Sequence, residues 1–169
     1  MAESGGRLKA GRGIVASASF TPAAAAYGAA DVMDVAKEFA FTYADSGEAV
    51  QTGSLIRITT SVLRIDETAL QASEAAYSLA LYNVTPPSAQ ADNAAWTLAS
   101  ADLSAYLGTL GLGTPVDAGA ALFIQTQPTD KQEYLMASGK ASLFGALITV
   151  AGFTATAVAR QVKLYGYIV

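Results

Sequence analysis

The residue types that most enzymes use for acid–base or nucleophilic chemistry are missing from this sequence. Its 169 residues include no His and no Cys, which removes the usual general base near neutral pH, a nucleophilic thiol, and zinc sites built on imidazole or thiolate. Serines are plentiful, but a serine nucleophile needs a neighbouring base, and only lysines or carboxylates could serve here. The sequence therefore predicts that the protein is not an enzyme.

Two pairs of acidic residues have a spacing that could suggest a glycosidase: Asp31 with Asp34, and Asp66 with Glu67. A retaining glycosidase holds its two carboxyl groups roughly 5 Å apart across a cleft, whereas sequence neighbours on a strand point to opposite faces. We interpret both pairs as loop and edge charges. Calcium at the first pair, or at residues 92–93, lacks the ligand spacing of a known calcium loop. We expect no bound metal and no cofactor.

Three glycines lie within residues 108–113, but this segment lacks the lysine of a phosphate-binding loop. Glycines inside an apolar strand more often mark a bulge or a tight turn. We therefore expect an irregular strand here.

The chain has a net negative charge and few charged residues. Fourteen acidic and ten basic residues give a net charge of -4, which disfavours a nucleic-acid binder because such proteins show a basic face. The exception is the amino end, where Arg7, Lys9 and Arg12 lie among glycines. Only 14% of residues are charged and 52% are apolar, against roughly a quarter charged in ordinary soluble domains. This composition favours an oligomer or a component of a larger assembly.

Two uncharged segments imitate membrane signals. Residues 13–30 follow a basic start, but their apolar content is too weak for the core of a signal peptide. Residues 141–159 are interrupted by glycines and hydroxyl residues, which suits a buried hairpin better than a membrane helix. We expect no contact with a membrane.

The chain divides into an arm and one domain. Residues 1–19 contain four glycines and three basic residues, which predicts a flexible amino-terminal arm. Such an arm is either disordered or becomes ordered on a neighbouring subunit. Residues 20–169 are long enough for a single buried core.

Strand patterns recur through this domain. Residues 38–43 alternate, with their aromatic side chains on one face. In residues 54–66, Ile56, Ile58 and Val62 share a face, after which Leu63 and Ile65 are the apolar positions. A change of parity by one residue is what a β-bulge produces, so we predict a bulge near Val62 and Leu63.

The remaining elements are also mostly strands. Residues 77–84 are apolar on both faces, which is typical of a strand covered on both sides. Residues 100–106 predict a short helix with Ser100 as its N-cap. Further strands are expected at residues 107–112, 120–127, 134–137, 143–150 and 160–169. The sequence thus predicts an all-β, jelly-roll-like or Greek-key antiparallel β-sandwich, with one short helix and an extended amino-terminal arm.

Aromatic residues are the best candidates for a contact surface. Tyr165 and Tyr167 point away from the apolar face of the last strand, so they form either an interface or sugar platform, or a second covered face. We interpret Trp96, just after a turn, as a plug under a loop. Together with the basic residues of the arm, the candidate interface residues are Arg7, Lys9, Arg12, Trp96, Tyr165 and Tyr167.

Several short motifs follow one another in a fixed order along the chain. They are a Thr-Pro opening that ends in Asp-Val (residues 21–32), a strand that ends in Pro-Pro (79–87), Asp-Asn-Ala-Ala-Trp (92–96), Asp-Leu-x-x-Tyr (102–106), and Leu-Phe-Gly-Ala-Leu (143–147) followed by Gly-Phe-Thr (152–154). Their order resembles that of small capsid decoration or cement proteins of tailed bacteriophages. The likeness spans residues 20–169, and the longer basic arm departs from it.

This resemblance implies a jelly-roll-like sandwich that binds the major capsid protein as a homotrimer on the virion surface, assembled in the host cytoplasm. Our leading hypothesis is therefore a virion structural protein that clamps capsid subunits through apolar and strand-edge contacts. A tail-associated or carbohydrate-binding or receptor-binding sandwich is the alternative, and a glycosidase is a remote third.

Overall fold

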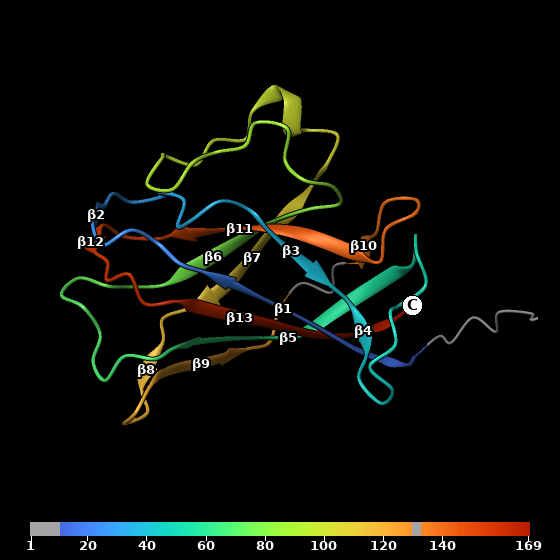
Figure 1. Ribbon diagram of the computed structural model, residues 1–169, viewed down its shortest axis with the longest axis horizontal. Coiled ribbons are helices and arrows are strands. Elements are labelled where there is room, and N and C mark those ends of the chain that lie inside the picture. Colours follow the sequence, from blue (N-terminus) through green and yellow to red (C-terminus); the bar gives the residue numbers. More distant parts are fainter. Residues whose placement is uncertain (1–10, 130–132) are drawn as a thin grey trace, which may run out of the picture.

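Nearly all regular structure in the protein is β-strand, as seen in a computed structural model that describes residues 11–129 and 133–169 (Figure 1). The larger sheet has the strand order β4-β1-β13-β5-β9-β8, with β10 also paired to β5. In that order, the strands are Thr42–Tyr43, Gly13–Phe20, Arg160–Ile168, Leu55–Ile65, Leu122–Thr126 and Val116–Asp117, and β10 is Glu133–Leu135.

The second sheet has the order β3-β11-β6-β7, and a separate two-stranded ribbon joins β12 to β2. The sheet strands are Lys37–Ala40, Ser142–Thr149, Tyr77–Tyr82 and Tyr106–Gly113, and the ribbon strands are Phe153–Thr154 and Ala26–Tyr27. All these pairs are antiparallel. The structure therefore confirms the predicted all-β, antiparallel class and is consistent with a sandwich.

One core joins the inner faces of the two sheets. Every second side chain of a strand enters this core, because successive side chains on a strand point to opposite faces. On β13, Val162 and Leu164 are buried and Lys163 between them is exposed. On β6, Leu79 and Leu81 enter the same core from the other sheet.

The predicted arm of residues 1–19 is wrong over its second half. Residues 13–20 form β1, which pairs with β13 at eight positions and also contacts β4. Ile14, Ala16 and Phe20 of β1 are buried. The pattern was hard to recognise because alanine fills inward positions where larger apolar residues usually stand. The domain therefore begins before Gly13, and Arg7 and Lys9 lie outside the described residues.

The β-bulge exists but lies three residues before its predicted place. Tyr165 pairs with Thr60 and Gly166 with Ile58, so Thr59 is the extra residue. The extra residue exchanges the inward and outward positions of the strand. As a result Ser61, despite its hydroxyl group, is buried, and Val62 lies on the outer face. Gly166 provides the space for the bulge, since an added Cβ would overlap the Arg57 carbonyl oxygen. A glycine inside a strand, such as Gly166 in the last strand, indicates a bulge in that strand or in its partner.

Three local predictions also need correction. The expected helix is a three-residue 3-10 turn, η1 (Ser100–Asp102), which follows Ala99 and has no side-chain cap. The expected hairpin of residues 141–159 does not form, because β11 pairs with β3 and β6 whereas β12 pairs with β2. Residues 38–43 are divided between β3 and β4 in different sheets, although their three aromatic side chains are buried together as predicted.

Within the part of the chain that the structure describes, no helix has the length and apolar character needed to cross a membrane.

Candidate interface

A long loop covers the outer face of the four-stranded sheet (Figure 1). We call this loop, residues 83–105, the roof. Under it, Tyr82, Ile148 and small residues of β6 and β11 form a second buried cluster against which Trp96 and Tyr106 pack. The Trp96 indole donates a hydrogen bond to the Tyr82 hydroxyl at 3.1 Å, and the Tyr82 and Tyr106 ring centroids are 5.6 Å apart. Trp96 therefore holds the roof down, consistent with its interpretation as a plug.

Two carboxylates fasten the roof. Asp102, fully buried, accepts hydrogen bonds from the backbone amide and the hydroxyl of Ser88, at 2.9 and 2.5 Å. Asp92 accepts hydrogen bonds from the Tyr27 hydroxyl and from the amides of Asp34 and Ala23, at 2.7, 2.6 and 2.9 Å. Burial alone would raise the pKa of Asp92, but these hydrogen bonds outweigh burial and lower the pKa.

Three of the motifs that carry the sequence resemblance, residues 21–32, 92–96 and 102–106, take part in the fastening of the roof. The segment of residues 92–96 runs beside residues 30–34, where the Val32 amide donates to the Ala94 carbonyl and the Trp96 amide to the Ala30 carbonyl, both at 2.8 Å. The Asp102 motif contacts the residue that follows the double proline. Motifs that are far apart in the sequence therefore build one structure, the fastened roof.

The outer face of the seven-stranded sheet is different because no comparable loop covers it among the described residues. In the described ranges, ten large apolar side chains stay exposed, and five of them lie on this face: Val116, Phe123, Leu135, Tyr165 and Val169. Strand register places them there. Val116 is paired with Phe123, Leu135 with Leu55, and Tyr165 with Thr60, and directly paired residues project to the same side. We call this surface the open face.

The middle of the open face is hollowed into a shallow groove of about 460 Å³, lined by Thr60, Val62, Phe123, Gln125 and Tyr165. Phe123 and Tyr165 are 39% and 37% exposed. The Lys163 ammonium lies 5.1 Å from the centroid of the Tyr165 ring, and over the described ranges it forms no ion pair. The groove therefore offers two aromatic side chains and uncharged polar groups, with one cation near the Tyr165 ring, which suits contact with another molecule.

The other predicted interface residues have structural partners. Tyr167 is on the open face but accepts a hydrogen bond from Arg57 at 2.9 Å, and Arg57 also forms an ion pair with Glu133. Arg12 forms an ion pair with Asp45 at 2.5 Å and covers the Tyr43 ring at 3.9 Å.

Of the predicted residues that the structure describes, Arg12, Trp96, Tyr165 and Tyr167, only Tyr165 lines the open groove. The side-chain hydrogen bond from Arg12 lowers the pKa of Asp45. Arg12 therefore links the residue before β1 to the turn after β4.

Sequence reasoning missed Phe123, Val116, Leu135 and Val169. Their side chains lie on the outward positions of strands whose inward positions are Leu122, Tyr134 and Ile168. Assigning parity along β9, β10 and β13 from their most apolar alternate positions could have found the open face.

The carboxylate pairs considered as glycosidase candidates serve the fold. Asp34 accepts a hydrogen bond from the Thr21 amide at 2.8 Å and pairs with Lys37 at 2.9 Å. Asp31 accepts a hydrogen bond from the Gly28 amide at 2.5 Å, and Asp66 pairs with Arg64 at 2.7 Å. Over residues 11–129 and 133–169, no group of three or more acidic side chains is placed to hold a metal ion.

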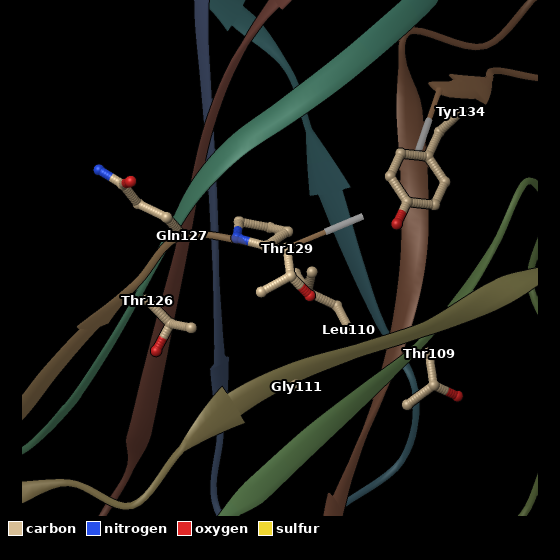
Figure 2. Close-up of a pocket in the computed structure, with 8 residues that line it drawn as sticks. Thr109, Leu110, Gly111, Thr126, Gln127, Thr129 and Tyr134 are labelled. Atoms are coloured by element: carbon tan, nitrogen blue, oxygen red, sulfur yellow. The ribbon is translucent and has the colours of Figure 1, made fainter. Parts of the chain in front are cut away.

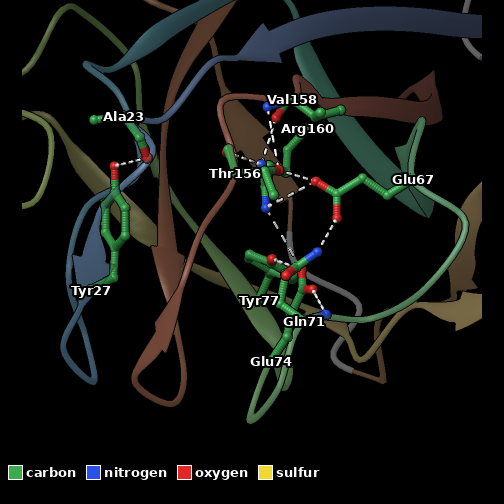
Figure 3. A network of polar contacts seen from close by, with 9 residues as sticks. All are labelled: Ala23, Tyr27, Glu67, Gln71, Glu74, Tyr77, Thr156, Val158 and Arg160. Atoms are coloured by element: carbon green, nitrogen blue, oxygen red, sulfur yellow. Dashed lines mark hydrogen bonds and ion pairs between the residues drawn. The ribbon is translucent and has the colours of Figure 1, made fainter.

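Glu67 belongs to a buried network around Arg160 at one end of the sandwich (Figure 3). The Arg160 guanidinium donates hydrogen bonds to the Thr156 and Val158 carbonyl oxygens at 2.8 and 2.5 Å, and lies 3.9 Å from carboxylate oxygens of both Glu67 and Glu74. The Arg160 and Glu74 side chains are fully buried. This network ties the loop between β5 and β6 to the start of β13, which is a stabilising role.

Comparison with known proteins adds little to this description. No protein-family model matches the chain, and no curated protein matches it. Among the solved structures that are similar to it is the native virion of Kashmir bee virus at acidic pH, with 10% sequence identity, a TM-score of 0.28, and coverage of 92% of this chain and 72% of that chain. At this TM-score, the likeness establishes neither a shared fold nor a shared function.

Proposed function

We propose that the protein is a non-enzymatic virion structural protein that binds the surface of a capsid, as a decoration or cement protein, through its open face. The observation that carries this proposal is that half of the exposed large apolar side chains among the described residues lie on one sheet face, while the roof covers the opposite outer face. Exposed apolar patches of this kind mark contact with another macromolecule. The order of sequence motifs that resembles phage decoration proteins supports the same reading.

We further propose that the sandwich is a jelly roll. Its eight principal strands, β1, β3, β5, β6, β7, β9, β11 and β13, are taken as first to eighth in chain order. One sheet then has the order first, eighth, third, sixth, and the other has second, seventh, fourth, fifth. The chain of a jelly roll is wound in this way, and jelly rolls occur in viral capsid and lectin domains. This strand order supports the proposal.

The proposed partners are the major capsid protein and further copies of the same chain, as a homotrimer on the virion surface. The low fraction of charged residues supports self-association, since 14% charge is little for a surface that faces only water.

A carbohydrate-binding or receptor-binding role is the second candidate, and the groove favours it. Phe123 and Tyr165 are exposed beside Gln125 and Thr60, and aromatic faces next to short polar groups suit a sugar ring. Trp96 is no part of this platform because it packs under the roof.

Sedimentation of the purified protein, alone and with capsids of the phage or virus whose genome carries the sequence, tests the proposal. We expect binding to capsids and at least a tenfold loss of affinity in the double variant Phe123→Ala and Tyr165→Ala, because central aromatic contacts commonly contribute 2 kcal/mol or more. Leu103→Ala, which removes an exposed apolar side chain from the roof, is the matched control. Unchanged capsid binding by the double variant would show that the open face is not the binding surface. A change in tyrosine fluorescence with glycans, without capsid binding, would favour the second candidate.

The role of the amino-terminal arm is tested by a truncation, and the position of β1 determines how many residues are removed. Removal of residues 1–19 would delete most of β1, so residues 1–10 are the segment to remove. We expect weaker attachment to capsids with an unchanged melting temperature. Full binding by this truncated protein would show that the arm has no part in attachment.

A further inference from the structure

Strand β7 lies at an edge of the four-stranded sheet, and it differs from every other edge strand among the described residues. It is eight residues long, whereas β3, β4, β8 and β10 have four, two, two and three. An edge strand carries unpaired backbone donors and acceptors, which proteins usually protect by shortness, charge, proline or cover. β3, at the opposite edge of the same sheet, is short and carries Lys37 and Glu38.

The sequence of β7 has no such protection. Its eight residues include three glycines and no charged residue or proline. Near its carboxyl end, β9 packs alongside, and the Thr126 hydroxyl donates a hydrogen bond to the Leu112 carbonyl at 2.7 Å. Further back along the strand, Thr109 and Gly111 are exposed. An added Cβ at Gly111 meets nothing within 4 Å, so a larger side chain fits at this position.

A cleft opens directly beside this edge (Figure 2). It has a volume of about 160 Å³ and lies between Thr109, Leu110 and Gly111 of β7 and residues 126–129, with Tyr134 of β10 also lining it. Such a volume holds one large apolar side chain, since a cavity of about 150 Å³ accepts benzene. No side chain that lines the cleft in the described ranges carries a charge.

We infer that β7 accepts an extended, uncharged segment of a different polypeptide as an added strand, with one large apolar side chain of that segment in the cleft. In strand addition, main-chain hydrogen bonds provide affinity and a pocket beside the edge selects a side chain. The part of the β7 edge that precedes its contact with β9 supplies the first requirement, and the neighbouring cleft supplies the second. This surface is separate from the open face, so the inference does not depend on a capsid as the partner.

The experiment uses the full chain and a displayed library of random ten-residue peptides as the probe. We expect enrichment of peptides that are uncharged and alternate apolar with polar residues. Gly111→Lys should weaken their binding at least tenfold, because it places a charge at the edge in a space that accommodates the side chain. Ala40→Lys makes the same kind of change at the exposed end of β3 and should leave binding unchanged. Equal melting temperatures of both variants and the parent chain confirm that they fold.

A second measurement separates strand addition from simple apolar contact. N-methylation of alternate amides in an enriched peptide should abolish binding in one register and preserve it in the other, because alternate amides of an added strand face the edge. Equal effects in both registers would overturn the inference, as would full binding by Gly111→Lys or a library without enriched peptides. A dimer of the protein that Gly111→Lys dissociates would also overturn it, since a second copy would then occupy β7.

Discussion

The two outer faces of the sandwich use aromatic residues for opposite purposes. Under the roof, Tyr82 is buried and its hydroxyl accepts a hydrogen bond from Trp96. On the open face, Tyr165 is 37% exposed, and the Lys163 ammonium lies 5.1 Å from the centroid of its ring. Both are tyrosines on outward positions of central strands, so residue type and strand parity alone do not distinguish them. What differs is whether a loop returns over the sheet.

The difference between the two outer faces follows from the length of the loops that connect the strands. Twenty-three residues separate β6 from β7, and they cross back over the sheet that contains both strands. Strands of the larger sheet have no connection that returns over their outer face within the described residues. A covered face contributes to stability by burying apolar area, whereas an open face retains that area for a partner. Substitutions on the two faces should therefore separate stability from binding.

The largest expected effect on stability comes from Tyr82→Ala under the roof. Removal of a large buried aromatic side chain costs about 3–5 kcal/mol of the free energy of unfolding, because transfer and cavity contributions add. Urea denaturation measures it. The matched variant Tyr165→Ala should change the same quantity by less than about 0.5 kcal/mol, as for other surface positions. Equal losses in the two variants would mean that the open face is covered in the isolated protein.

The next effect comes from the fastening at Asp102. Asp102→Ala removes the acceptor of the Ser88 amide and hydroxyl hydrogen bonds, and unsatisfied buried donors cost about 1–3 kcal/mol. We expect a loss of about 2 kcal/mol in the free energy of unfolding, together with a red shift of the fluorescence of the single tryptophan as the roof loosens. Asp102→Asn, which retains one acceptor oxygen, should lose less. Unchanged fluorescence in Asp102→Ala would show that Trp96 holds the roof without this carboxylate.

The strands that could be predicted from the sequence are those with large apolar residues at alternate positions. Residues 160–169 alternate clearly and include β13, and residues 77–84 have apolar residues on both faces and include the doubly covered β6. β1 was missed because alanine serves at an inward position. The bulge lies earlier than predicted because the polar residue Ser61 is buried, which the alternation of apolar residues alone does not indicate.

The candidate interface was only partly predictable, for a physical reason. An exposed Phe123 is recognised as exposed only when the strands on either side of it are known, since pairing and not polarity decides which face remains uncovered. Tyr165 was found because the last strand alternates well. Arg12 and Trp96 were chosen for their residue types, and both have intramolecular partners that lie 33 and 14 residues away in the sequence.

A smaller effect concerns pH and the second fastening. Because the folded-state pKa of Asp92 is lowered, its contribution to stability is complete above the unfolded pKa of about 4. The contribution is lost as the pH falls through the lower, folded value. The difference in free energy of unfolding between the parent chain and Asp92→Asn should therefore be constant from pH 7 to about 5 and shrink below about 4. Other carboxylates, such as Asp45, contribute equally to both chains and cancel. A difference that grows at low pH would contradict the assigned hydrogen bonds.

The smallest effect on stability is expected at the centre of the open face, where the comparison is sharpest. Phe123→Ser replaces an exposed ring beside the groove, so we expect a change of less than about 0.5 kcal/mol in the free energy of unfolding. Self-association should nevertheless fall if the open face contributes to it, because fewer apolar side chains remain uncovered. Sedimentation equilibrium over a range of concentrations measures this, with Leu103→Ser on the roof as the control for lost apolar surface. If both serine variants reduce association equally, the exposed apolar surface acts without specificity. If only Phe123→Ser does so, the open face is the surface through which the protein meets its own copies.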